Sequence, residues 1–198
     1  MQTNLYTKIT DALVDDGYII IQNALQPSLA SSLKSYAKNE TNFKPAGISG
    51  KSDLHLDATR RRDKIQWLEH DAKTQSEFLD FADGLREHLN RELYLGLSYY
   101  ESHFAIYDEG NFYEKHLDSF KNFKNRVVTT VYFLNEEWTD EDGGALVVYD
   151  AKDNLLAKVE PQANTLVVFM SENFPHEVLP TKKKRYSIAG WFRIDKHD

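Results

Sequence analysis

Two histidines and one aspartate carry the first chemical signal in the sequence. His116 and Asp118 are two positions apart, so in an extended segment their side chains project to the same face. His176 lies 58 positions after Asp118 and follows a strand expected over 165–170. Two imidazoles and one carboxylate form the facial triad that typically binds non-haem iron(II) and leaves coordination positions open. The pattern therefore predicts an iron(II) site at these three residues.

A fourth residue, Arg185, raises the significance of the triad. It lies nine positions after His176 and opens an apolar segment, 186–192. A guanidinium presents a planar fork that matches a carboxylate with two parallel hydrogen bonds. We therefore expect Arg185 to hold the distal carboxylate of 2-oxoglutarate while the keto acid end chelates the metal. Taken alone, a His-x-Asp pair recurs by chance and Arg185 could merely end the basic run 182–185, so the joint pattern carries the prediction.

Composition limits the other function classes. The 198 residues are 41% hydrophobic and 13% aromatic, which predicts one folded domain over 1–198. The formal net charge of −7 argues against nucleic acid as the main partner, because that binding needs clustered Lys and Arg. Cysteine is absent, so any metal must use His and carboxylate ligands, and a cytoplasmic location is the simplest expectation. No segment has the length and apolar character of a membrane span, and no secretion signal is recognised, so neither membrane insertion nor secretion is expected.

The elements that must position these residues change in character near residue 95. Residues 1–95 alternate helical and strand patterns, with helices expected near 5–13, from 27 and over 78–89, and strands at 18–21 and 64–68. The Gly-, Ser- and Asp-rich segment 40–60 is expected to be a mobile loop that covers a site. Residues 96–193 contain short β-rich runs at 99–107, 127–134, 145–149, 165–170 and 186–192. This spacing favours a barrel or jelly roll, buttressed on one sheet by the helices.

Several motifs together resemble a known family. They are Tyr-x5-Tyr-x2-His-x-Asp at 107–118, Arg-x2-Thr-x2-Tyr-x-Leu-Asn at 126–135, Gly-Gly-x-Leu at 143–146 and His-Glu-Val-x-Pro-x4-Arg-Tyr at 176–186, with Trp138 between them. Upstream, 61–67 resembles an Arg-x-Asp-Lys-Ile-x-Trp segment. Over residues 60–192 the chain thus resembles the prolyl hydroxylases among the 2-oxoglutarate oxygenases, especially those acting on hypoxia-inducible factor and their bacterial relatives.

The resemblance implies a double-stranded β-helix (jelly-roll) fold and a dioxygenase of the procollagen-proline type that uses Fe(II), 2-oxoglutarate and O2, with ascorbate as a candidate reductant. It also implies that Tyr107 hydrogen-bonds near the keto acid and that Leu146 and Trp191 line the pocket. One position departs from the family: Phe133 stands where those enzymes have a tyrosine that helps to bind the cosubstrate carboxylate. Tyr132 is a poor substitute, because on a strand it should point to the opposite face.

The substrate is less constrained. The resemblance implies a protein or peptide that contains proline, bordered by Arg61, Asp63 and Trp191, although Arg61 and Asp63 could equally form a surface ion pair. Two alternatives stay open: a hydroxylase of a free amino acid or small molecule, and a cupin-like metal-binding protein that does not oxidise. The second leaves Arg185 and Tyr107 unexplained. The remaining positions are expected to be structural or solvated, namely a turn at Gly143 and Gly144, core tryptophans at 67 and 138, and histidines at 55, 70, 88, 103 and 197.

Overall fold

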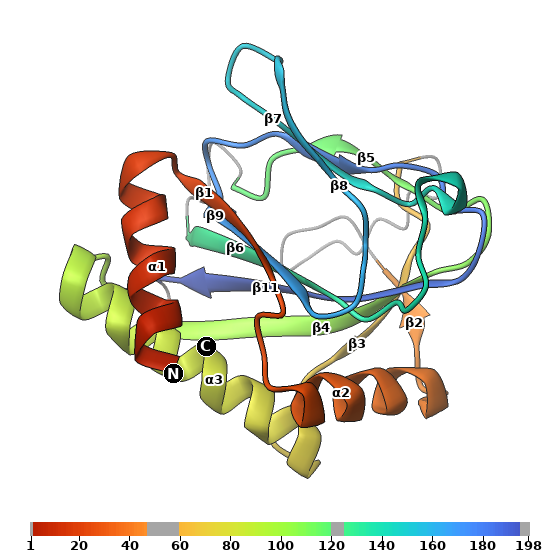
Figure 1. Ribbon diagram of the computed structural model, residues 1–198, viewed down its shortest axis with the longest axis horizontal. Helices are drawn as coiled ribbons and strands as arrows, with labels where there is room; N and C mark the ends of the chain where they lie inside the picture. Colours follow the sequence, from red (N-terminus) through yellow and green to blue (C-terminus); the bar gives the residue numbers. More distant parts are fainter. Residues whose placement is uncertain (1, 47–59, 120–124, 195–198) are drawn as a thin grey trace.

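The computed structural model describes residues 2–46, 60–119 and 125–194, and its centre is a pair of antiparallel sheets (Figure 1). The larger sheet has the strand order β1-β9-β6-β11-β4-β3-β2. Its strands are β1 (Tyr18–Gln22), β2 (Lys44–Pro45), β3 (Lys64–Trp67), β4 (Tyr99–Tyr107), β6 (Arg126–Phe133), β9 (Thr165–Met170) and β11 (Arg185–Arg193). The smaller sheet has the order β5-β10-β7-β8, made of β5 (Tyr113–His116), β7 (Leu146–Tyr149), β8 (Leu155–Val159) and β10 (His176–Val178). A short 3-10 helix, Asp140–Asp142, precedes β7.

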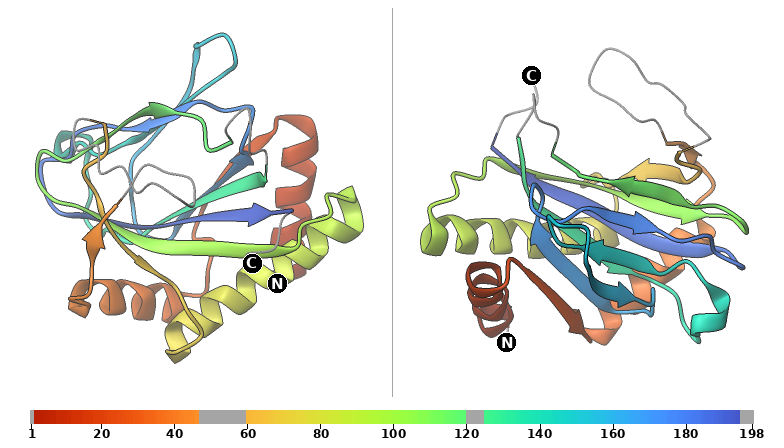
Figure 2. Two further views of the ribbon diagram at one scale, coloured as in Figure 1. Left: turned by 180° about the vertical axis from the view of Figure 1, so that it is seen from behind. Right: turned by 90° about the horizontal axis from the view of Figure 1, so that it is seen from above.

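Three helices cover the outer face of the larger sheet, and the smaller sheet covers the inner face (Figures 1 and 2). The helices are α1 (Gln2–Asp15), α2 (Pro27–Asn39) and α3 (Lys73–Leu93). One core lies between helices and sheet, and contains Ile9, Leu33 and Leu85. A second core lies between the two sheets, and contains Leu146 and Val178 from the smaller one. The mostly β, double-stranded β-helix architecture expected from the sequence is therefore confirmed.

Strand alternation decides what enters the space between the sheets. Along β11, Ile188 and Phe192 belong to the helix-side core, whereas residues 185, 187, 189 and 191 line a pocket on the other side. In β6, Tyr132 packs toward the helices and Phe133 toward the smaller sheet. The expectation that Tyr132 points away from the cosubstrate side is thus confirmed.

Most predicted elements agree with the observed ones, and the differences are local. Strands 99–107 and 165–170 are confirmed at both ends, and α3 is longer than the expected 78–89. The sequence did not predict β2, β5, β8 or β10, which have two to five residues each. Of the expected loop 40–60, residues 44–45 form β2 instead, and 47–59 lie outside the described residues, as do the histidines at 55 and 197.

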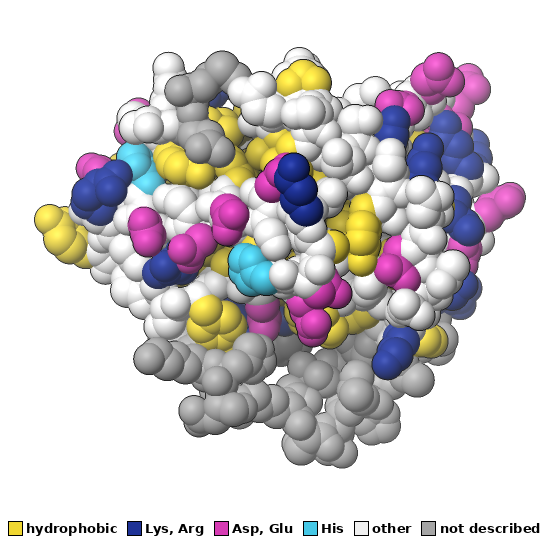
Figure 3. All heavy atoms as spheres, turned by 90° about the horizontal axis from the view of Figure 1, so that it is seen from below, with side chains coloured by type: hydrophobic (Ala, Val, Ile, Leu, Met, Phe, Trp, Pro, Cys, Tyr) yellow, Lys and Arg dark blue, Asp and Glu magenta, His cyan; other side chains and the backbone are white. Residues whose placement is uncertain are grey.

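The surface mixes both signs of charge. On the face that α2 and α3 present, Lys and Arg side chains are interspersed with Asp and Glu (Figure 3). Within the described ranges, no helix combines the length and the apolar character that crossing a membrane requires.

Candidate active site

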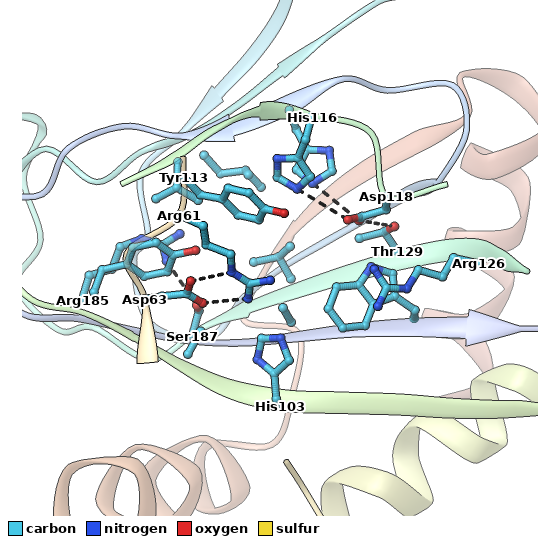
Figure 4. A pocket seen from close by; sticks show the side chains of 18 residues that line it. Arg61, Asp63, His103, Tyr113, His116, Asp118, Arg126, Thr129, Arg185 and Ser187 are labelled. Carbon is cyan, nitrogen blue, oxygen red and sulfur yellow. Dashed lines mark hydrogen bonds and ion pairs between the residues drawn. The ribbon is translucent and has the colours of Figure 1, made fainter. Parts of the chain in front are cut away.

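Three predicted metal ligands meet between the sheets, and Figure 4 shows His116 and Asp118 directed toward each other. His116 ends β5 and His176 begins β10, and these two residues are direct partners in the antiparallel pairing of the two strands. Asp118 follows β5 by two positions and completes the cluster, in which the candidate ligand atoms all lie within 4.8 Å of one another. Strand pairing therefore brings together residues that are 58 positions apart in the sequence.

Both imidazoles are oriented by backbone carbonyls. Nδ1 of His116 lies 2.7 Å from the carbonyl oxygen of Glu114, and Nδ1 of His176 lies 3.0 Å from that of Phe174. Because a carbonyl oxygen can only accept, each Nδ1 must carry the proton, which leaves both Nε2 lone pairs for a metal. The two Nε2 atoms face the Asp118 carboxylate at 3.6 and 3.5 Å. Burial lowers the pKa of His176 to about 4, so this imidazole is neutral at physiological pH.

The carboxylate of Asp118 is held from the other side by a buried hydroxyl pair. Thr129 on β6 donates to Asp118 Oδ2 at 2.8 Å, and its Oγ1 also lies 2.8 Å from Ser171 Oγ. Burial opposes the charge on Asp118, but the adjacent imidazoles of His176 and His116 hold its pKa well below its usual value. Two imidazole nitrogen donors and one oriented carboxylate fit iron(II) in the facial arrangement.

Arg185 lies at the opposite end of the same pocket and is almost fully buried, with 1% of its surface exposed. Its Nε donates to the carbonyl oxygen of Gly144 at 2.8 Å and its Nη1 to Ser187 Oγ at 3.2 Å. Nη2 is buried and has no hydrogen-bond partner among the described residues. Burial lowers the pKa of Arg185 to about 10, which still leaves it charged near pH 7. A buried cation with unused donors is suited to a carboxylate ligand.

Gly144 allows the close approach of Arg185. The glycine has a φ of +69°, and a Cβ at this position would lie 3.0 Å from Arg185 Cδ and 3.0 Å from Thr181 Oγ1. The neighbouring Gly143 has a φ of +66°. The backbone at Gly144 therefore packs directly against the buried guanidinium.

Tyr107 and Phe133 flank the guanidinium. Arg185 Cζ lies 5.0 Å from the centre of the Tyr107 ring and 5.1 Å from that of Phe133. Burial raises the pKa of Tyr107 far above its ordinary value, so its hydroxyl stays protonated and can donate a hydrogen bond. Phe133 offers no donor.

Arg61 and Asp63 lie inside the pocket as well (Figure 4). The guanidinium of Arg61 meets the Asp63 carboxylate with two hydrogen bonds, of 2.6 and 2.9 Å, and lies 4.7 Å from the centre of the Tyr113 ring. Their side chains are 12% and 0% exposed. The alternative of a surface ion pair is therefore wrong, because the pair is buried in the wall of the site.

The structure adds pocket residues that the sequence did not single out for the site. They are His103, Ala105, Tyr113, Arg126, Thr129, Val131, Val178, Ser187 and Ala189. His103 was expected to be structural or solvated, but it is buried in the pocket wall between the rings of Trp67 and Trp191, at centroid distances of 5.2 and 5.4 Å. Strand alternation could have found it, because His103 and Tyr107 lie on the same face of β4. Trp67 was expected in the core, but it is 47% exposed.

The metal cluster and the buried guanidinium define a site for a metal and a dicarboxylic keto acid, and comparisons with known proteins agree. The 2OG-Fe(II) oxygenase superfamily model matches residues 102–193. A solved prolyl-4-hydroxylase from Pseudomonas putida is 36% identical, with a TM-score of 0.88, and the alignment covers 96% of this chain and 99% of that one. A prolyl hydroxylase from Trichoplax adhaerens, solved with a hypoxia-inducible factor peptide fragment, is 25% identical, with a TM-score of 0.86 and coverage of 97% and 90%.

Curated relatives point the same way. Human Egl nine homolog 1 is 33% identical over 153 residues, which are 73% of this chain and 35% of that protein, so the chain spans about a third of that relative. The chain belongs to the 2OG-Fe(II) oxygenase superfamily and, within it, to the prolyl hydroxylase family. Enzymes of this superfamily use Fe(II), 2-oxoglutarate and O2.

Proposed function

We propose that the chain is an iron(II)- and 2-oxoglutarate-dependent dioxygenase that hydroxylates a prolyl residue in a protein or peptide and releases succinate and CO2. The observation that carries the proposal is one pocket with the His116, Asp118, His176 cluster at one end and, at the other, a buried Arg185 Nη2 that has no hydrogen-bond partner among the described residues. The likeness to prolyl hydroxylases from bacteria and animals supports the prolyl substrate. The cytoplasmic location and the single domain over 1–198 stay predictions.

The residues of the site have separate roles in this proposal. His116, Asp118 and His176 bind the metal; the carbonyls of Glu114 and Phe174 orient the two imidazoles, and the Thr129 hydroxyl orients the carboxylate. When bound, iron(II) and 2-oxoglutarate supply the oxygen activation that no amino-acid side chain provides.

The rest of the pocket binds the cosubstrate and the substrate. Arg185 binds the distal carboxylate of 2-oxoglutarate, and Tyr107 donates a hydrogen bond near the keto acid. Arg61, Asp63 and Trp191 form the substrate side of the pocket, where their burial keeps water from the reacting carbon.

Mass spectrometry of whole-cell protein tests the proposal directly. Cells that carry the gene should contain a peptide in which one proline has gained an oxygen atom, and that peptide should revert to the unmodified mass when the gene is deleted. Restoring the gene should restore the modification, whereas a His116→Ala version should not.

The same comparison can favour the small-molecule alternative. If no prolyl modification depends on the gene, and the purified protein oxidises free proline or another amino acid efficiently with 2-oxoglutarate, the peptide substrate is wrong. The oxygenase assignment would survive that result, because it depends on the metal and cosubstrate residues and not on the substrate.

A further inference from the structure

His103 is a buried histidine that lies in the pocket wall away from the cosubstrate residues. It belongs to β4, and Figure 4 shows its ring projecting from that strand into the pocket. Tyr107, at the end of the same strand, lies beside Arg185 and marks the cosubstrate end. Four residues of extended strand span roughly 13 Å, so His103 is well separated from that end. Its ring packs beside Trp191, on the substrate side of the pocket.

The surroundings of His103 determine which of its nitrogens carries the proton. Nδ1 lies 3.2 Å from the carbonyl oxygen of Phe104, which can only accept, so Nδ1 carries the proton and Nε2 has a lone pair. Burial and the nearby positive charge of Arg61 lower the pKa of His103 to about 4, so the ring is neutral near pH 7. At that pH Nε2 can accept a hydrogen bond but cannot donate one.

Among the described residues, none donates a hydrogen bond to His103 Nε2. The nearby Asp63 carboxylate is already engaged, because it accepts from Arg61. Ala105 and Ala189, next along this face of β4 and opposite His103 on β11, have methyl side chains that offer no donor. A buried acceptor without a donor is unfavourable, so this wall of the pocket is suited to a ligand that brings its own N–H.

We propose that His103 is a specificity-determining residue whose Nε2 accepts a hydrogen bond from a backbone N–H of the substrate next to the target proline. This inference rests on the proposed function, because it takes a prolyl peptide as the substrate. A proline within a chain has no N–H of its own, so the donor belongs to the residue before or after it. A substrate that lacks this donor would leave the acceptor unpaired, and polar pockets reject analogues in this way.

Peptide libraries test the hydrogen bond without knowledge of the natural target. Every peptide in the parent library has one central proline between random residues. Two further libraries carry an N-methyl group on the residue before or the residue after that proline, which removes one N–H. Mass spectrometry measures how much proline has gained an oxygen atom. The wild type should hydroxylate one of the two N-methylated libraries with a kcat/KM about ten-fold below that of the parent, the size expected for one buried hydrogen bond.

Substitutions at His103 separate this hydrogen bond from the bulk of the N-methyl group. His103→Gln and His103→Met form a matched pair, because the side chains have similar length and only glutamine has a strong acceptor. Gln should keep the loss caused by N-methylation, and in Met this loss should be about ten-fold smaller than in the wild type. His88→Gln replaces a buried histidine of α3 outside the pocket and should behave as the wild type. Substrate-free decarboxylation of 2-oxoglutarate should be equal in all four proteins.

The outcomes distinguish this inference from the proposed function. If N-methylation costs the wild type and His103→Met the same at both positions, or if the Gln and Met variants do not differ, the role of His103 is overturned while the prolyl hydroxylase assignment stands. If the wild type hydroxylates no peptide of any library although it decarboxylates 2-oxoglutarate, the peptide substrate of the proposed function is wrong, and this inference fails with it.

Discussion

Gly144→Ala tests whether the turn at 143–144 positions the buried guanidinium. The substitution places a Cβ 3.0 Å from Arg185 Cδ and 3.0 Å from Thr181 Cβ, closer than ordinary van der Waals contact. Gly96 is a matched control, because its φ of +67° is close to the +69° of Gly144 and a Cβ there would meet nothing within 4 Å. Both substitutions strain the backbone, but only one of them moves Arg185.

The two effects have separate magnitudes. A non-glycine residue in the left-handed region is destabilised by about 1–2 kcal/mol, so Gly96→Ala should lose about that much free energy of unfolding, and Gly144→Ala should lose more because its Cβ also crowds Arg185 and Thr181. Displacing Arg185 should also weaken its charge-assisted hydrogen bonds to the cosubstrate, which contribute about 1.5–3 kcal/mol each. Since 1.4 kcal/mol is a factor of ten, Gly144→Ala should raise the dissociation constant for 2-oxoglutarate roughly ten- to a hundred-fold.

Two measurements separate strain from displacement. Urea denaturation should show a loss of unfolding free energy for both variants, larger for Gly144→Ala because its Cβ also crowds Arg185 and Thr181. Anaerobic titration should show weaker 2-oxoglutarate binding only for Gly144→Ala. Equal dissociation constants for both variants would refute the idea that this glycine positions Arg185.

Substitutions at three further positions test other parts of the site. His116→Ala should abolish turnover and should weaken iron binding by more than the roughly 10- to 100-fold that is typical when a residue hydrogen-bonded to a metal ligand is changed. His88→Ala should leave the metal content unchanged in anaerobic dialysis. Normal iron binding by His116→Ala would refute the assignment of the three ligands. Arg185→Ala should steeply raise the 2-oxoglutarate concentration needed for activity, and Arg185→Lys should raise it less, because lysine keeps the charge and loses the fork. If neither substitution changes uncoupled succinate formation, the cosubstrate carboxylate is bound by another residue. Asp63→Asn should remove the carboxylate charge that faces Arg61 in the pocket wall, so we expect about 3–5 kcal/mol less unfolding free energy in urea. An unchanged value would mean that the pair contributes little to stability.

Those parts of the fold that depend on local pattern could be predicted from the sequence. The short β-rich runs at 99–107 and 186–192 identified β4 and β11, and the two-residue spacing of His116 and Asp118 correctly placed these two candidate ligands side by side. The sequence also predicted that Arg185 shares a site with the triad, because its guanidinium fork and its position nine residues after His176 completed the joint pattern, and the structure places it in the same pocket.

Those parts that depend on pairing between distant segments could not be predicted. β5 reads Tyr-Glu-Lys-His and β10 has three residues, so neither has an apolar alternation of its own, and each becomes a strand only beside the other. The burial of Asp63 likewise arises from packing, since its neighbours in the sequence are charged. The prediction that Trp67 lies in the core was wrong, because an aromatic residue on a strand near the sheet edge need not be covered by other elements.

The register of β11 links the stability of the fold to the assembly of the site. Arg185 is paired with Tyr107 across one edge of the strand, and Ser187 with Phe133 across the other. A slip by one residue would exchange the two faces, placing Ile188 in the pocket and Arg185 among the apolar residues that pack on the helices. That arrangement would expose an apolar side chain to the pocket and bury an unpaired cation in the core, and both changes are unfavourable. The hydrophobic pattern that stabilises the larger sheet therefore also selects the register in which Arg185 and Ser187 face the metal ligands.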